Sequence, residues 1–291
     1  MLQALINGLI AGCGYGLVAV GFALVYAVFR ILHVANGGIY ATAAYVVCWL
    51  TVDRGFGAPA AISAGILVGG TLGWLVETRI YRPLRHSNSS SLVLLIASLG
   101  VLIVVQNLLS LVFGDGTRTL RPGVVQSAIV IGSLHITLLQ VAIVVVSTLL
   151  YVVTSTILFL TRIGCLVRAV ADDHYLATVV GVPTDRVLLL VMVGASALAS
   201  GAAILVAYDT DLTPMMGFEA VFIGITATVV GGMGSFPGAW LGGLLIGLAR
   251  NLGGWWLPAR WQDAVVFAVL VVFLLLRPQG FFGKPLKKAH L

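Results

Sequence analysis

The chain has 291 residues, of which 60% are hydrophobic and only 9% are charged. Soluble domains hold roughly 45–50% apolar and about 25% charged residues, so a soluble globule of this size is excluded. Several uncharged runs exceed the ~20 residues that cross the ~30 Å hydrocarbon layer, and the short alternating segments of a β-barrel are absent. The composition predicts an all-α polytopic membrane protein with about 8–9 transmembrane helices, in one transmembrane domain over residues 1–291.

Nine apolar segments follow one another along the chain. The segment at 1–30 lacks a basic leader and a small-residue cleavage site, so we expect it to stay as the first span. The predicted spans are Leu5–Phe29, Ile39–Val52, Ala60–Val76, Leu92–Phe113, Leu138–Leu160, Val187–Ala207, Phe218–Val230, Ala239–Leu252 and Ala264–Leu276. Residues 218–252 are the weakest part of this count, because they also fit one re-entrant pair. Residues 123–136 predict a short hairpin or an interfacial segment.

The net charge of +6 lies mainly in the loops between spans, which is typical of membrane orientation rather than of nucleic-acid binding. Eleven of the sixteen cations fall on one side if Arg30, Arg79–Arg85, Arg162–Arg186 and Arg277–Lys288 share it. The other side then has four, Arg54, Arg118, Arg121 and Arg260, and Arg250 is ambiguous. The positive-inside rule places loop 161–186 and the basic tail 277–291 in the cytoplasm and the N-terminus outside.

Glycine-rich breaks interrupt the apolar pattern once in each half of the chain. Non-helical backbone at membrane depth is tolerated where it is buried in protein or lines a watery cavity, and paired breaks point to a transport pathway. Ordinary surface turns are the alternative, and no clear sequence repeat relates the halves. The candidate path residues are Asn36, Gly37, Gly38, Gly231, Gly232, Gly234 and Pro237. Gly8, Gly12 and Gly16, four apart, predict close helix packing.

The sequence contains no residue pattern that predicts catalysis, ion coupling or nucleotide binding by this chain itself. Glu77, Glu219 and Asp263 lie near span ends, and the absence of a mid-span acid argues against coupling to protons or sodium. The pair Gly283-Lys284 precedes a proline, so no phosphate-binding loop exists. The five histidines and three cysteines are scattered, which supports neither a metal site nor a disulfide. We expect no enzyme and no cofactor in this chain, with energy supplied by another polypeptide.

Residues 161–186 form a polar island between two uncharged spans. The pattern predicts one short helix over Arg162–Val180, ended by Gly181 and Pro183, because proline cannot continue a helix. Thr184 or Asp185 is the expected N-cap of the next span. Leu166, Val170 and Ala177 are expected along one stripe. The island docks a soluble partner or rests on lipid headgroups. Its candidate contact residues are Arg162, Arg168, Asp172, Asp173, Ala177, Gly181, Pro183 and Asp185.

Motifs along nearly the whole chain resemble the branched-chain amino-acid permease family of ABC importers, the LivH type, to which urea and amide permeases are related. The most specific block is Gly231-Gly-Met-Gly-Ser-Phe-Pro-Gly-Ala239. The others are Asn7–Gly12 with Tyr15–Leu17, His33–Tyr45, Thr161–Gly164, Arg168–Ala171, Gly181–Arg186 and Pro214–Ala220. The resemblance implies an ABC importer permease fold. It also implies a second homologous permease, two cytoplasmic ATPases that bind ATP and magnesium, and a periplasmic solute-binding protein.

The sequence and the resemblance together predict the permease subunit of an ATP-driven importer for a small polar solute, with branched-chain or other amino acids favoured. Urea, amides and other small solutes remain alternative cargoes. An ion-coupled secondary carrier and a passive solute channel are the alternatives of another class.

Overall fold

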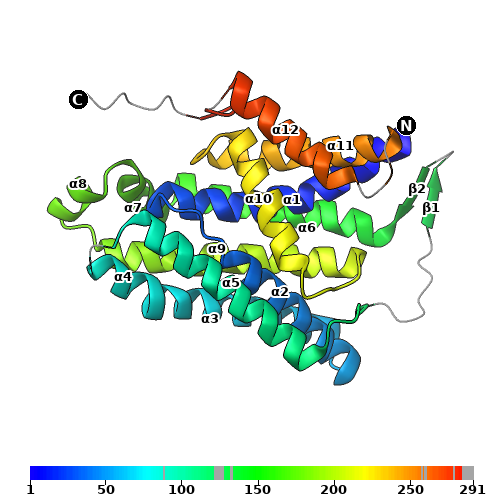
Figure 1. Cartoon of the computed structure of the whole chain (residues 1–291), viewed down its shortest axis with the longest axis horizontal. Coiled ribbons are helices and arrows are strands. Elements are labelled where there is room, and N and C mark those ends of the chain that lie inside the picture. Colours follow the sequence, from blue (N-terminus) through cyan, green and yellow to red (C-terminus); the bar gives the residue numbers. More distant parts are fainter. Residues whose placement is uncertain are drawn as a thin grey trace.

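The computed structural model describes residues 1–87, 89–120, 128–131, 134–256, 258, 261–277 and 279–283. Most of these residues are helical, and the longest helices lie side by side along one axis (Figure 1). The α-helices are α1 (Leu2–Phe29), α2 (Asn36–Cys48), α3 (Ala58–Val76), α4 (Arg82–His86), α5 (Ser91–Phe113), α6 (Leu138–Leu160), α7 (Arg162–Asp172), α8 (His174–Val179), α9 (Thr184–Asp209), α10 (Met216–Gly231), α11 (Phe236–Trp256) and α12 (Gln262–Leu276). Two π-helical segments, η1 (Trp49–Asp53) and η2 (Glu77–Tyr81), continue α2 and α3.

The polytopic helical prediction is confirmed, but the structure gives fewer long spans than nine. Five helices are long and apolar enough to cross a membrane: α1, the continuous stretch Ala58–His86, α5, α6 and α9. The pair α10–α11 passes the same test together but bends by 119°. The remaining apolar segments, α2 and α12, have 13 and 15 residues. Each is short for an upright crossing of the ~30 Å hydrocarbon layer, although η1 lengthens α2, so the predicted number of spans stays a prediction.

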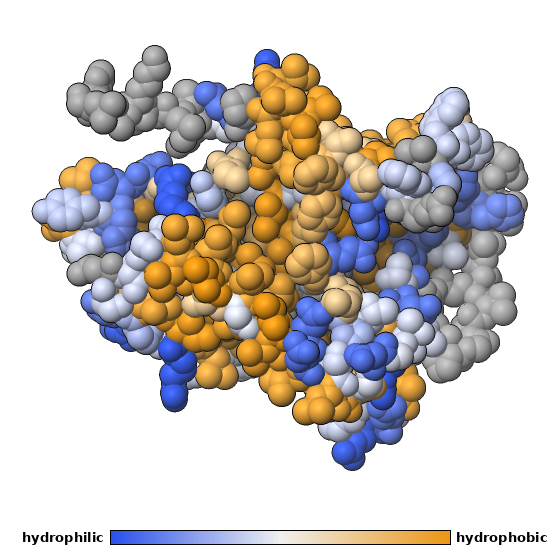
Figure 2. Space-filling model, viewed as in Figure 1, coloured by the Kyte–Doolittle hydropathy of each residue, from blue (hydrophilic) through white to orange (hydrophobic). Residues whose placement is uncertain are grey.

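An apolar belt separates polar groups at the two ends of the bundle on the face shown in Figure 2. The polar groups lie over α4, α7 and α8 at one end and over the hairpin end at the other. In lipid every backbone polar group must be satisfied within the protein, which a helical bundle achieves. The distribution is that of a multi-pass membrane protein.

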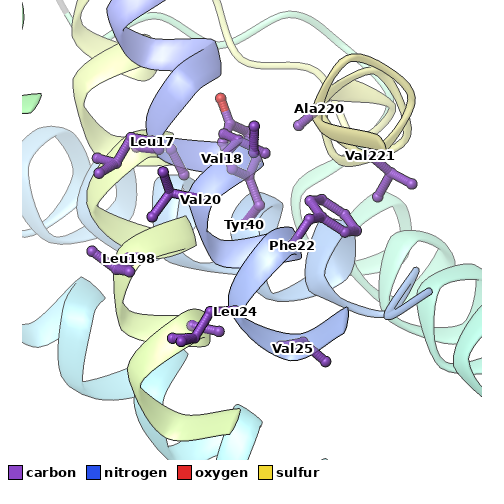
Figure 3. Close-up of a cluster of buried hydrophobic side chains, with 14 of the residues drawn as sticks. Leu17, Val18, Val20, Phe22, Leu24, Val25, Tyr40, Leu198, Ala220 and Val221 are labelled. Atoms are coloured by element: carbon purple, nitrogen blue, oxygen red, sulfur yellow. The ribbon is translucent and has the colours of Figure 1, made fainter. Parts of the chain in front are cut away.

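Helix α1 forms the centre of the bundle. Within its most apolar window 83% of the residues are buried, against 11% for α6, so α6 faces outward. Leu17, Val20 and Leu24 on α1 lie toward α9, and Phe22 lies toward Val221 on α10 (Figure 3). Helix α1 has apolar side chains on all its faces because protein surrounds it on most sides.

The two halves of the chain repeat one arrangement with opposite direction. A long helix, a turn and a short buried helix follow one another in α1–α2 and again in α9–α10. Helix α3 packs along α9, α11 packs along α1, and each short helix packs on the long helix of the other half. The two short helices meet at Gly37 and Gly217, where a Cβ on either glycine would meet the backbone of the other. Inverted repeats of this kind are common in transporters, although the sequence shows no matching repeat.

Small residues allow the closest helix approaches at corresponding places in both halves. On α1, Gly12 lies so close to α11 that a Cβ would come within 2.9 Å of the Leu244 Cα. On α9, Ser196 and Ser200 fill the space left by Gly73 and Gly69 of α3. The predicted packing role of the glycines on α1 is confirmed, because small side chains let backbones approach in lipid.

A β-hairpin precedes α6. Strands β1 (Ala128–Ile131) and β2 (Leu134–Thr137) pair antiparallel, as the hairpin alternative predicted, while residues 121–127 and 132–133 lie outside the described residues. Thr137 then starts α6 through a capping box with Gln140. The Gln3 side chain donates to the His135 carbonyl at 2.9 Å, which joins the hairpin to the start of α1.

Candidate functional site

The polar island forms two short helices instead of the single helix predicted. Helix α7 ends at Asp172, and Asp173 is extended (φ −152°) with its carboxylate accepting from the Leu176 amide at 2.9 Å. Asp173 therefore N-caps α8, which begins at His174. The one-helix prediction is wrong because this capping interaction competes with continued helix at Asp173.

Backbone contacts hold α7 against the bundle. The Arg168 guanidinium donates to the Leu158 and Phe159 carbonyls at 2.9 and 3.1 Å, which are end groups of α6 without a helical partner. Arg30, at the end of α1, donates to the Ala171 carbonyl at 2.8 Å. Gly164 packs so tightly that a Cβ would meet the Leu158 carbonyl. These contacts tie α7 to the ends of two long helices.

Helix α8 presents an apolar surface that the other described residues leave exposed. We call it the α8 face, and its residues Tyr175, Leu176, Val179 and Val180 have exposed fractions of 76%, 57%, 67% and 82%. Ala177 is buried beneath them. Of the predicted stripe, Val170 and Ala177 are buried and Leu166 is half-buried, while Arg162, Asp172 and Asp173 are exposed. An exposed apolar patch on a short polar loop is typical of a surface that binds either a protein or a membrane.

The segment after α8 turns sharply into α9. Gly181 has φ +88°, a conformation that L side chains rarely adopt, and the predicted stop at this residue is confirmed. Pro183 occupies the N-cap position of α9 without a side-chain cap, so the prediction of Thr184 or Asp185 as the cap is wrong. The Val182 amide donates to the Ala177 carbonyl at 3.0 Å, which keeps the segment folded against α8.

Asp185 makes ion pairs in place of a cap. Its carboxylate lies 3.2 Å from Arg82 and 3.6 Å from Arg85, with His86 Nε2 at 3.7 Å. The first turn of α9 is thus joined to α4. A polar pocket of about 430 Å³ opens beside this junction, lined by Arg85, His86, Ser89, His174 and Asp185. The basic run 79–86 was counted only for orientation in the sequence, and its pairing with Asp185 needs the tertiary fold.

The first helix break is packed inside the bundle. Asn36, Gly37 and Gly38 are buried at the start of α2, and the Asn36 Oδ1 atom has no hydrogen-bond partner in the described part of the chain. Gly37 lies against Gly217 of α10, and Gly38 lies against Val105 of α5. The break therefore lies where α2, α5 and α10 meet. The burial of these residues shows that the break is not an ordinary surface turn, and a buried polar atom without a partner is costly.

The second break lies elsewhere. Gly232 (φ +113°) and Gly234 (φ +80°) form the turn between α10 and α11, and Gly231 packs on Gly238 across it. The Phe281 and Phe282 amides donate to the Val230 and Gly231 carbonyls, both at 3.0 Å. Pro237 lies in the first turn of α11. The segment that faces Asn36–Gly38 is therefore the start of α10, whereas Gly231–Pro237 packs on the segment after α12.

A charged cluster around Arg250 is a further site that sequence reasoning missed. Arg250 lies 2.6 Å from Glu219 and 3.1 Å from Asp263, and it donates to the Tyr15 hydroxyl at 2.6 Å. The cluster joins α1, α10, α11 and α12. Both acids are at span ends, as predicted, and both are paired.

Metal and disulfide chemistry have no support among the described residues. Over these ranges no three His, Cys, Asp or Glu side chains are grouped to hold a metal ion. Cys13 and Cys48 are buried and Cys165 is exposed, and all three are free.

Comparisons with known proteins agree with this architecture. The family model for the branched-chain amino acid transport system permease component matches residues 4–274. The chain is 34% identical over 298 residues to the high-affinity branched-chain amino acid transport system permease protein LivH of Escherichia coli K12, covering 98% of this chain and 96% of the relative. It is 33% identical to the corresponding protein BraD of Pseudomonas aeruginosa, with the same coverage. The protein named as a probable LivH of Methanocaldococcus jannaschii is 26% identical over 94% of this chain and 89% of its own. No solved structure matches. The chain belongs to the branched-chain amino acid transport system permease family.

Proposed function

We propose that this chain is the permease subunit of an ATP-driven importer, and that its cargo is a branched-chain amino acid. The cargo proposal rests on the names of the relatives, which match the chain over nearly its whole length. In this proposal the helices supply the route across the membrane, and separate partner subunits bind the ATP and magnesium. Specificity for the solute lies mainly in a periplasmic binding protein.

The α8 face is the proposed site of energy coupling. It is apolar, exposed and presented on short helices that hydrogen bonds fix to the ends of α1 and α6. A cytoplasmic ATPase that grips this face would move α7 and α8 as one unit. Helices α6 and α9, which flank the island directly in sequence, would pass that movement to the bundle interior.

The distribution of cations supports a cytoplasmic position for the α8 end. Arg30, Arg82, Arg85 and Arg168 lie at this end, in contact with α7, with the start of α9 or with the end of α6. Arg118 pairs with Asp53 near the opposite end. The positive-inside rule then places α7 and α8 in the cytoplasm and the N-terminus outside, in a bacterial inner membrane. The cations of residues 284–291 lie outside the described residues.

The proposed solute path runs past the first helix break, at Asn36–Gly38. It lies where α2, α5 and α10 meet, and its lining around Asn36–Gly38 is small and largely uncharged. That Gly231–Pro237 also lines this path stays a prediction from the sequence. A second permease subunit is proposed to complete the path, which the family's description as the permease component of a transport system supports.

Reconstitution tests this proposal directly. The chain is placed in proteoliposomes with its second permease and ATPases, and uptake of radiolabelled leucine is followed with the binding protein outside and ATP inside. We expect uptake that stops without ATP or without the ATPases, and competition by isoleucine and valine but not by urea or acetamide. Uptake driven by an ion gradient without nucleotide would establish a secondary carrier, and facilitated flux through this chain alone would establish a passive channel. If only urea or acetamide competed, the transported solute would be an amide and not a branched-chain amino acid.

A further inference from the structure

A nearly buried ion pair lies between the α8 end of the protein and the first helix break. Glu77, at the start of η2, has a side chain only 2% exposed, and its Oε1 atom lies 2.6 Å from Arg85 Nη2. The Arg85 guanidinium is itself 22% exposed and stacks 5.3 Å above the Phe29 ring at the end of α1. Charges at such depth are costly, and they persist in membrane proteins mainly where they serve function.

The same arginine reaches the segment that follows α8. Arg85 lies 3.6 Å from Asp185 in the first turn of α9, so one guanidinium bridges a buried acid and a half-exposed acid. Only five residues separate α8 from Asp185, and Gly181 and Pro183 make their path a tight turn. Movement of α8 must therefore displace Asp185 or strain this turn.

On its other side the ion pair connects to the break through η2. Glu77 and Tyr81 are the first and last residues of this π-helical segment, and both are buried. The Tyr81 hydroxyl lies 2.7 Å from His33 Nδ1, and the two rings meet edge to face with centroids 5.5 Å apart. π-Helical segments are rare and are frequently found at functional sites.

His33 stands directly before the break. Burial lowers the pKa of His33 to about 3, so its imidazole is neutral and its contact with Tyr81 is a hydrogen bond between uncharged groups. Three residues on, Asn36 begins α2, and the intervening Ala35 amide donates to Ser98 of α5 at 2.8 Å. A shift of His33 would therefore move the backbone at Ala35 and Asn36, where the break begins.

We call five of these residues the polar relay: Asp185, Arg85, Glu77, Tyr81 and His33. We propose that the polar relay transmits movement of α8 to the helix break at Asn36, so that Glu77 and Arg85 are positioning residues for transport. This inference rests on the proposed function. Three polar atoms in the relay, Glu77 Oε2, Arg85 Nη1 and His33 Nε2, are buried without a partner in the described part of the chain. Unsatisfied groups give the relay an alternative set of partners to adopt when the helices move.

The test measures how many ATP molecules are hydrolysed per solute imported by the reconstituted complex. Glu77→Gln keeps the size of the side chain and removes its charge, and Asp53→Asn does the same to the pair with Arg118 at the opposite end. We expect Glu77→Gln to raise the ATP-to-solute ratio by about 5-fold or more, while Asp53→Asn leaves it at the wild-type value. The α8 face is unchanged in both variants, so ATPase binding is expected to be normal.

The double variant Glu77→Gln/Arg85→Met separates the relay from a structural role. Replacing both charges also removes the arginine that has lost its buried partner, which is expected to restore thermal stability. The relay predicts that the ratio stays high although stability recovers. A wild-type ratio in Glu77→Gln or in the stable double variant would overturn the inference while leaving the proposed function intact. A wild-type complex that fails to import with ATP would instead overturn the proposed function.

Discussion

At the scale of single residues, glycines decide how closely the helices approach one another. Gly247 on α11 faces Gly12 on α1, and a Cβ at Gly247 would meet the Gly12 backbone. We predict that Gly247→Leu lowers the stability of the purified protein by about 1–3 kcal/mol, because backbone atoms cannot give way to the larger side chain.

The control for this change is Gly100→Leu on α5. A Cβ at Gly100 meets nothing within 4 Å, so the same side chain is added to open space. Thermal unfolding in detergent should show a lower midpoint for Gly247→Leu than for Gly100→Leu. Equal midpoints would contradict the assigned packing of α1 on α11.

Gly181 offers a second comparison at this scale, in which only backbone conformation differs. Both Gly181 and Gly194 have open space at the Cβ position, but Gly181 has φ +88° and Gly194 lies within α9. We predict that Gly181→Ala costs about 1–2 kcal/mol of local stability and slows ATP-driven uptake, because alanine strains the left-handed conformation. Gly194→Ala should leave uptake unchanged. Normal uptake by Gly181→Ala would remove the turn from the coupling mechanism.

At the scale of elements, the start of α8 depends on one side chain. Asp173 caps the helix by accepting from the Leu176 amide. We predict that Asp173→Ala destabilises α8 by about 1 kcal/mol and weakens binding of the ATPase, because the α8 face loses its fixed orientation. Asp173→Asn keeps an acceptor and should bind like the wild type. Equal weakening in both variants, measured by co-purification, would mean that the charge and not the cap matters.

The sequence predicted the type of most elements better than their breaks. Long uncharged runs such as Leu138–Leu160 give helices with the expected ends, since length and hydropathy suffice to define them. The break at Asp173 was missed because Asp172-Asp173 also fits an exposed helix surface. Runs of 13 or 14 apolar residues were counted as spans, although such lengths equally suit buried or bent helices like α2 and α10.

The candidate site was only partly predictable for a related reason. The polar island at 161–186 was predicted because its charges lie between uncharged apolar runs. The turn at Gly181 was predicted because glycine and proline have local conformational preferences. The pairing of Asp185 with Arg85 joins residues one hundred positions apart, and the pairing of Glu77 with Arg85 depends on the π-helical segment between them. Such contacts are set by packing, which local sequence patterns do not encode.

At the scale of the whole molecule, the fold predicts which end faces the cytoplasm. We expect a cysteine replacing Tyr175 on α8 to resist a membrane-impermeant maleimide in intact cells and to react after lysis, and a cysteine replacing Asp115 to react in intact cells. Asp115 follows α5 near the Arg118–Asp53 pair, at the end opposite α8. The background variant lacks Cys13, Cys48 and Cys165 so that each label reports one position. The reverse pattern would invert the orientation.

The central claim is that the α8 face receives energy from a separate ATPase, and site-specific photocrosslinking tests it most directly. A benzophenone amino acid replaces Tyr175 on α8 or Phe56, another exposed aromatic residue near the other end, with exposed fractions of 76% and 57%. In membranes that hold the whole transporter, we predict a crosslink from position 175 to the ATPase subunit and none from position 56. A probe at 175 that labels only lipid, while the complex stays assembled and active, would contradict the account.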